Sequence, residues 1–273
     1  MYRTAVYSVI YVLDHIRNGT GTGWIFFLSE EIQLHAYKFI LDNASNVFRA
    51  YGITIFVTFV GTAINLMMSA LLAYPLSLKD LPGRKILNFY IFFTMLFNGG
   101  LVPTYLMYTG IFHINNTLLA YIIPGFLMSA MNVMLIRTFF ATSIPDALFE
   151  AAQIDGASQL QIFLKVVLPL GKPILVAMGL LSGLGYWNDW TNGLYYIRDT
   201  QLYGIQNLLN KMISDLTALT QNASGASTVA IADIPSASVR MAIAFVAMLP
   251  ILCLYPFLQK YFTKGIALGA VKG

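Results

Sequence analysis

Two stretches of the chain, residues 50–78 and residues 86–136, contain no Asp, Glu, Lys or Arg. A helix needs about 20 apolar residues to cross the hydrocarbon core of a bilayer. The first stretch is therefore long enough for one crossing. The second is too long for one, and residues 110–116 interrupt it. We therefore predict an all-α fold, a polytopic bundle of transmembrane helices.

The composition places the chain in the same class. Hydrophobic residues make up 58% of the sequence and charged residues 10%, whereas soluble domains carry about 25% charged residues. The net charge of +4 comes from cations at the ends of apolar runs, which is typical of membrane proteins and not of a nucleic-acid binder. The single cysteine, Cys253, excludes an internal disulfide, and the three scattered histidines offer no metal site.

The apolar runs set the expected spans and domains. We expect about five full spans, near residues 50–78, 86–109, 117–137, 173–190 and 241–259. The run at residues 5–13 is too short to span, and the polar residues 191–239 are expected to connect two spans outside the bilayer. The predicted domains are an N-terminal segment (1–50) mostly outside the bilayer, a transmembrane domain (51–262) that includes the loop at 143–173, and a tail (263–273).

The positions of the Lys and Arg residues predict the orientation of the chain in the membrane. Three of them lie in residues 79–85, three in residues 137–172 and three from residue 260 onward. These segments adjoin the spans, and the side of the membrane that carries such cations is usually cytoplasmic. The loop at residues 143–173 and the C-terminus are therefore expected in the cytoplasm.

This loop keeps a helical pattern. Ser143 is placed to cap a helix, with Pro145 in its first turn and Asp146 closing a capping box. Gly156 is expected to end the helix in a left-handed conformation, and a second short helix is expected from about Ser158. From the pattern alone, a docking element and an amphipathic hairpin that only stiffens the bundle are both open.

The sequence of the loop resembles a known motif. Its Glu150-Ala151-Ala152, Asp155-Gly156-Ala157 and Leu168-Pro169 are similar to the EAA loop of bacterial ABC-importer permeases. The resemblance covers about residues 37–273. The runs GGLVPTYLMYTGIFHINNT, YWNDWTNGLYYI and KGIALGAVKG resemble the carbohydrate branch, the maltose-type second permease, in particular the permeases that accompany lipoprotein-type oligosaccharide-binding proteins.

The resemblance implies a function and partners. The loop would be a coupling helix that docks on an ATP-hydrolysing subunit through Glu150, Ala151, Ala152, Asp155, Gly156, Ala157, Leu168 and Pro169. The implied partners are a second permease subunit (a heterodimer), two ATPase subunits, an extracytoplasmic solute-binding protein and the lipid bilayer, in the bacterial plasma (inner) membrane. The family has six spans, so the first span here is expected to be truncated or degenerate.

The chain lacks the motifs of an energy-converting site. It has no GxxxxGK[ST] stretch, because Pro173 follows Gly171-Lys172, and so we expect no ATP site and no enzyme activity. No charge lies deep in a predicted span, so no ion relay is visible. We expect no bound cofactor, and alternating access driven by ATP used on the partners. The alternatives are a permease for a non-sugar solute, a secondary transporter or channel, and a non-transporting scaffold or sensor subunit.

Several residues are candidates for the substrate path. Aromatic rings and amides suit hydroxylated sugar rings, which favours the segment Tyr186, Trp187 and Asn188, with Asp189 and Trp190 beside it. An interfacial aromatic belt with Asp189 in water is the alternative. Three further amides, Asn65, Asn98 and Asn132, either line the path or bond between helices.

Overall fold

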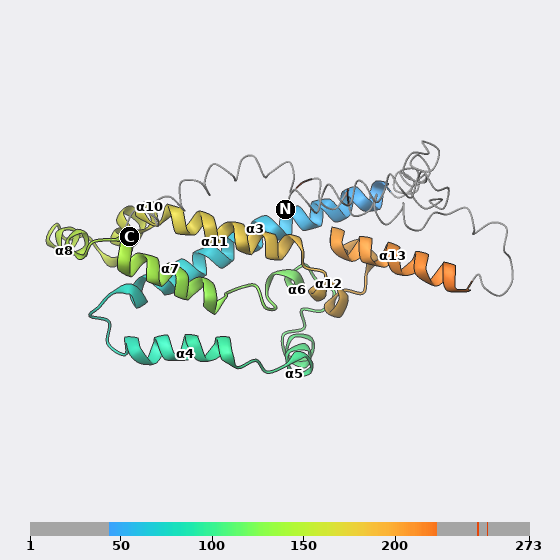
Figure 1. The fold of residues 1–273 in the computed structure, drawn as a ribbon, viewed down its shortest axis with the longest axis horizontal. Helices are drawn as coiled ribbons and strands as arrows, with labels where there is room; N and C mark the ends of the chain where they lie inside the picture. The colour runs from blue at the N-terminus through green and yellow to red at the C-terminus, as the bar shows by residue number, and fades with distance from the viewer. Residues whose placement is uncertain (1–43, 223–244, 246–249, 251–273) are drawn as a thin grey trace, which may run out of the picture. The chain divides into compact units, whose positions relative to one another are not determined.

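A computed structural model describes residues 44–222 and the single residues 245 and 250. Within these residues every regular element is a helix (Figure 1), so the predicted all-α class is confirmed for this part. The tail at 263–273, the short run at 5–13 and, apart from residues 245 and 250, the expected span at 241–259 lie outside the described residues. The chain divides into two compact units, and residues 45–212 lie in the larger one.

Helix α3 (Ala44–Ser77) matches the first predicted span. It is the one helix of the described part that is by itself long and apolar enough to cross a membrane. Its buried positions, which include Ala50, Gly61, Asn65 and Ala73, recur at helical spacing and are mostly small. Large apolar side chains such as Phe59 are exposed on the outside. Small residues let neighbouring helices approach closely, so this stripe is the packing face of α3.

The predicted span at 86–109 is not one continuous helix. Helix α4 (Arg84–Leu96) ends before a sharp bend of 108°, after which α5 (Leu101–Leu106) continues into a π-helical turn at Met107–Ile111. The bend follows from Asn98-Gly99-Gly100. Gly100 has a φ of +86° and donates its N–H to Asn98 Oδ1 at 2.8 Å, a local turn that competes with the helix. The two helices form either a broken span or a re-entrant loop.

The predicted span at 117–137 is also interrupted. Helix α6 (Leu119–Ile122) has a single turn, and α7 (Ala130–Ser143) begins after a loop that contains Pro124 and Gly125. Helix α11 (Lys172–Trp187) agrees with the span at 173–190 and is bent by 78° from the helical residues 159–170. Counting each bent pair as one span gives at most three spans in the described part, so the count of five does not follow from it.

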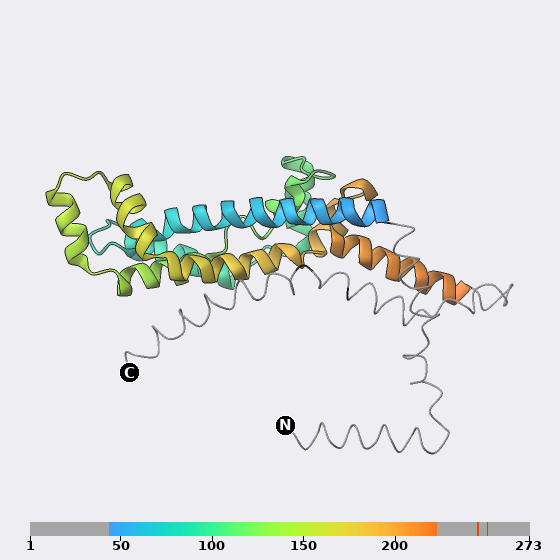
Figure 2. The same ribbon diagram turned by 90° about the horizontal axis from the view of Figure 1, so that it is seen from above.

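Helices α3, α7 and α11 of the larger unit pack side by side (Figures 1 and 2). The loop between α7 and α11 projects from one end of these helices. An apolar core fills this end, where Leu76 of α3, Phe140 of α7 and Val167 of the loop are fully buried. The loop therefore folds onto the bundle and is not a free excursion of the chain.

The segment after α11, which we predicted as a polar connection, is largely helical up to residue 222. Residues 191–222 contain α12 (Thr191–Tyr196), a 3-10 turn (Thr200–Leu202) and the amphipathic α13 (Ile205–Asn222). Tyr196, Ile197 and Ile205 are buried against α3 and α6 neighbours. Burial of these side chains explains why the first half of the expected polar connection is helical.

Candidate functional site

The projecting loop begins with α8 (Asp146–Ile154). Ser143 is the last residue of α7, and extended Pro145 stands at the N-cap of α8 without a side-chain cap. The predicted capping box between Ser143 and Asp146 is therefore wrong. Ile144 between the two helices is buried, so burial of this side chain fixes the corner in place of a polar cap.

The turn after α8 confirms the prediction for Gly156. Its φ is +71°, and its N–H donates to the Gln153 carbonyl at 3.0 Å while Ala157 N–H donates to Ala152 at 3.0 Å. This pair of bonds is the Schellman arrangement, which favours glycine at the left-handed position. A second helix then starts at Ser158, whose side chain and that of Gln161 form a reciprocal capping box. The predicted helix–turn–helix is confirmed.

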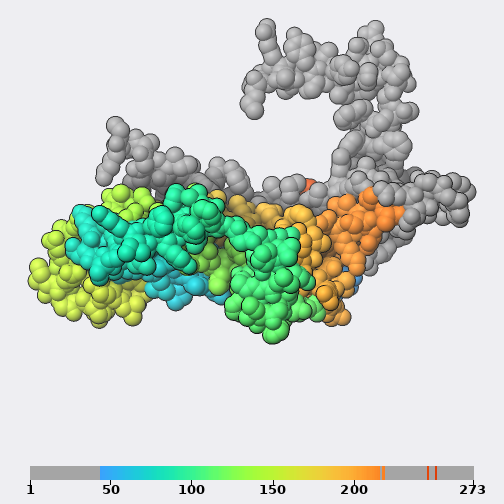
Figure 3. Space-filling model, turned by 90° about the horizontal axis from the view of Figure 1, so that it is seen from below, coloured from blue at the N-terminus to red at the C-terminus, as the bar shows by residue number. Residues whose placement is uncertain are grey.

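The motif residues differ in exposure. Glu150, Ala151, Asp155 and Gly156 are exposed. The loop to which they belong is the yellow-green segment at one end of the larger unit in Figure 3. Ala152 and Ala157 are half-buried and pack against the apolar core. Leu168 and Pro169 belong to α10 (Leu168–Leu170), on the returning arm of the loop, where Leu168 also packs against the core. Their docking on an ATPase stays a prediction.

One residue of α3 contacts both arms of the loop. The Tyr74 ring lies 5.4 Å from the Phe163 ring and 6.4 Å from the ring of Phe149, the one buried side chain of α8. The Tyr74 hydroxyl donates to Gln159 Oε1 at 2.6 Å. Sequence reasoning missed Tyr74 and Gln159, because nothing in the sequence pairs residues so far apart.

A second link joins the loop to the α3–α4 connection. Lys79 forms an ion pair with Asp146 in the first turn of α8. The hydrogen bond and charge of Asp146 raise the pKa of Lys79. Both side chains are more than half exposed, and exposed ion pairs contribute little stability. The buried Tyr74 contacts are therefore the main connection between α3 and α8.

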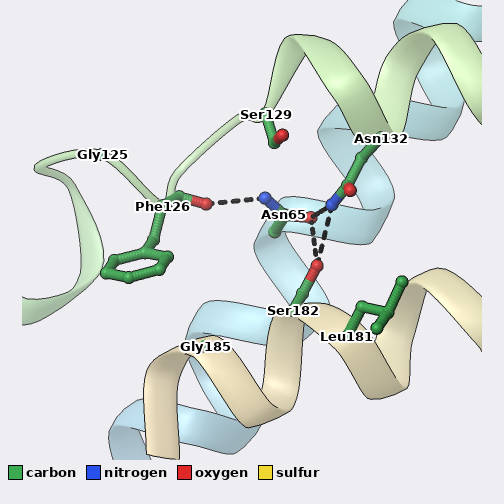
Figure 4. Close-up of a pocket in the computed structure, with 8 residues that line it drawn as sticks. All are labelled: Asn65, Gly125, Phe126, Ser129, Asn132, Leu181, Ser182 and Gly185. Carbon is green, nitrogen blue, oxygen red and sulfur yellow. Dashed lines mark hydrogen bonds between the residues drawn. The ribbon is translucent and has the colours of Figure 1, made fainter. Parts of the chain in front are cut away.

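Two of the three predicted asparagines meet in the bundle. Asn132 of α7 donates to Asn65 Oδ1 at 3.0 Å and to Ser182 Oγ at 2.8 Å, and Ser182 donates to Asn65 Oδ1 at 3.1 Å (Figure 4). Asn65 in turn donates to the Phe126 carbonyl at 2.6 Å. Hydrogen bonds among Asn65, Asn132 and Ser182 thus form a polar cluster that joins three helices.

The polar cluster borders a cavity of about 210 Å³. Its lining includes Ser129 and the α11 residues Leu181 and Gly185 (Figure 4). Ser182 and Ser129 were missed at the sequence level, since a lone serine in an apolar run gives no signal. Asn98 lies elsewhere, in the bend between α4 and α5. Contact of Asn65 and Asn132 with a substrate stays a prediction.

The predicted aromatic segment lies at the end of α11. Tyr186 is buried, donates to the Ile122 carbonyl at 3.2 Å and packs its ring directly on Gly61. Trp187 is 6% exposed, and within the described residues its Nε1 has no hydrogen-bond acceptor. Asn188 is exposed and donates to the Leu184 carbonyl.

Asp189 is 8% exposed, so the alternative that placed it in water is wrong. Its carboxylate accepts hydrogen bonds from the Asn192 N–H and side-chain amide, and that amide also donates to the Pro124 carbonyl at 3.0 Å. The pair of Asp189 and Asn192 thus fastens the turn between α11 and α12 to the loop before α7.

Comparison with known proteins identifies the family. Residues 50–268 match the model of the binding-protein-dependent transport system inner membrane component. Protein LplC of Bacillus subtilis is 37% identical over 91% of this chain and 82% of its own length. The polygalacturonan/rhamnogalacturonan transport system permease protein YtcP of the same organism is 36% identical over 88% and 82%.

A solved structure agrees with these relatives. A chain of a bacterial ABC transporter involved in the import of the acidic polysaccharide alginate matches with a TM-score of 0.71 and 32% identity, over 83% of this chain and 79% of that one. The resemblance seen in the EAA-type loop is therefore confirmed. The chain belongs to the family of binding-protein-dependent transport system inner membrane components.

Proposed function

We propose that this chain is a permease subunit of an ATP-driven ABC importer and forms half of the translocation path for a sugar or oligosaccharide delivered by a solute-binding protein. The observation that carries the proposal is the geometry of α8, which presents Glu150 and Ala151 outward while Phe149 is buried. A short helix with a small, exposed outer face and an anchored inner face fits a groove on a partner. The chain itself is not an enzyme, and separate ATPase subunits hydrolyse ATP.

The proposed assembly contains this chain, a second permease subunit, two ATPase subunits and an extracytoplasmic binding protein. In it, α8 lies on the cytoplasmic side and docks on an ATPase subunit. Closure of the ATPases moves α8, and the bundle then exposes the path to the other side of the membrane. Support comes from the family assignment and from the basic residues that adjoin the spans on the side of α8.

The cargo is proposed to be an oligosaccharide. Support comes from the relatives, which include a polygalacturonan/rhamnogalacturonan permease and an alginate importer, and from a melibiose/raffinose/stachyose import permease that is 30% identical. The polar cluster and Trp187 are the proposed contacts of this chain. An indole N–H and amide groups can bond sugar hydroxyls, and an N–H that is buried without an acceptor costs free energy until a ligand supplies one.

The test is reconstitution of the full importer in vesicles, with trigalacturonate and raffinose as acidic and neutral probes. Glu150→Lys is expected to abolish ATP-dependent uptake while leaving the fold intact, because it reverses the charge on the docking face. Asp80→Lys, an exposed acidic residue of the α3–α4 connection, is the matched control and is expected to retain uptake. Normal uptake and ATPase stimulation in the Glu150→Lys importer would contradict the docking role, and uptake by the chain without ATPases would contradict the importer.

A further inference from the structure

The contacts of Tyr74 join three segments that are far apart in the sequence. From α3 its ring contacts Phe149 in α8 and Phe163 in the returning arm, and its hydroxyl bonds Gln159 at the start of that arm. Tyr74 is 7% exposed. The ring therefore lies between the two arms of the loop and fixes both to the same turn of α3.

The backbone around Tyr74 is held independently of the loop. Ser77 Oγ donates to the Tyr74 carbonyl at 2.6 Å, and the Leu78 N–H donates to the Pro75 carbonyl at 3.2 Å. In a regular α-helix the Leu78 N–H would donate to the Tyr74 carbonyl. The Ser77 hydroxyl donates to this carbonyl instead, which holds the backbone at Tyr74.

The covalent connections of α8 lead only to α7 and α9 (Gln159–Ile162), through the corner at Ile144-Pro145 and the turn at Gly156. Neither connection reaches α3. The exposed pair of Lys79 and Asp146 does reach toward it, but exposed ion pairs are weak and screened by salt. The buried aromatic contacts of Tyr74, together with its part-buried hydrogen bond to Gln159, are the stronger connection.

We propose that Tyr74 is a positioning residue that makes α3 and the coupling helix α8 move as one body when the ATPase subunits close. This inference rests on the proposed function, because it assigns the route by which motion of α8 reaches α3. Phe149, Phe163 and Gln159 are its contacts in the loop. Without Tyr74, α8 would still dock, but its movement would pass to α7 and α11 only.

The experiment measures the distance between α8 and α3 in the complete importer by double electron–electron resonance. Spin labels are placed on Leu148→Cys of α8 and Phe59→Cys of α3, both exposed positions, after the one native cysteine is replaced by Cys253→Ser. Distances are recorded without nucleotide and with ATP plus vanadate. We expect one narrow distance, unchanged by ATP, in the importer with native Tyr74.

Three variants test the connection. Tyr74→Leu removes the ring and the hydroxyl, and we expect a second distance to appear with ATP. Tyr74→Phe keeps the ring, and because it loses one hydrogen bond we expect the equilibrium constant for the linked state to fall roughly two- to tenfold. Gln159→Leu removes the same hydrogen bond and is expected to match Tyr74→Phe. Tyr90→Phe, an exposed tyrosine of α4, is the control.

The KM for ATP distinguishes a positioning role of Tyr74 from a general loss of structure. A variant that still docks correctly on the ATPase subunits is expected to keep the KM for ATP of the importer with native Tyr74. If Tyr74→Leu does not assemble, Tyr74→Phe and Gln159→Leu decide. Unchanged distances with ATP in both of these variants would overturn the inference. The proposed function fails on a different result, a Glu150→Lys importer that still couples ATP hydrolysis to uptake.

Discussion

Asn132 of α7 donates a hydrogen bond to Asn65 of α3 at 3.0 Å, and both side chains contact Ser182 of α11. One polar cluster thereby joins the three packed helices of the bundle. Within the bilayer no hydrophobic effect drives helices together, because the lipid tails are as apolar as the side chains. Hydrogen bonds between helices and close backbone packing therefore hold the helices together.

Removal of this cluster should loosen the bundle. Asn132→Ala is expected to lower the free energy of unfolding by about 0.5–2 kcal/mol, the range for hydrogen bonds between membrane helices. Ser182→Ala is expected to cost less, because Asn132 retains Asn65. Thermal unfolding of the purified protein in detergent measures both, and a double-mutant cycle gives the coupling. Additive effects would show that the two side chains do not interact in the membrane.

The contact of Tyr186 with Gly61 should tolerate no side chain. A Cβ atom at Gly61 would lie 2.5 Å from the Tyr186 ring, whereas nothing lies within 4 Å of one at Gly52 on the same helix. Gly61→Ala is expected to destabilise the protein by about 1–3 kcal/mol through overpacking. Gly52→Ala is the matched control and is expected to be neutral or stabilising. Equal melting temperatures for the two variants would contradict the packing.

The turn at Gly156 should depend on backbone conformation alone. A Cβ atom there would meet nothing within 4 Å, but the φ of +71° is costly for other residues. Gly156→Ala is expected to cost about 1–2 kcal/mol and to reduce ATP-driven uptake. Gly156→Asn should be milder, since asparagine tolerates this region. Protease protection of the loop and uptake by the importer measure the effects, and an Ala variant as stable as the Asn variant would argue against them.

Substitution of Trp187 tests whether this residue contacts the substrate or only packs in the bundle. Its buried Nε1 has no acceptor within the described residues, so Trp187→Phe removes an unpaired donor and is expected to leave the melting temperature unchanged or raised. If a sugar hydroxyl accepts from Nε1, the KM for uptake should rise by roughly tenfold, as expected for about 1.4 kcal/mol. An unchanged KM would remove Trp187 from the proposed path.

Sequence patterns predicted the structure correctly where contacts between neighbouring residues decide it. The left-handed turn at Gly156 and the start of a second helix at Ser158 follow from side-chain chemistry within a few residues. The charge-free run before Lys79 predicted α3 for the same reason. The capping role of Ser143 failed because burial of Ile144 decided where α7 ends.

Interrupted helices were harder to predict. The run at 86–109 reads as one apolar span, but Asn98 and Gly100 form a turn that bends it. Hydropathy reports only that residues are apolar, and it does not report the direction of the chain. In the same way, the polar run after Trp190 did not reveal α13, whose first residue is fixed by a hydrogen bond from its N–H to Thr54 in α3.

The all-α class, the membrane setting and the helix–turn–helix within residues 143–173 can be predicted from the amino-acid sequence, because hydrophobic length, charge placement and glycine conformation are properties of neighbouring residues. Only the tertiary structure decided that Tyr74 lies between Phe149 and Phe163, and that Asn65, Asn132 and Ser182 meet. These residues are brought together by the packing of α3 against α7 and α11, and packing depends on the shapes of surfaces that no local pattern records.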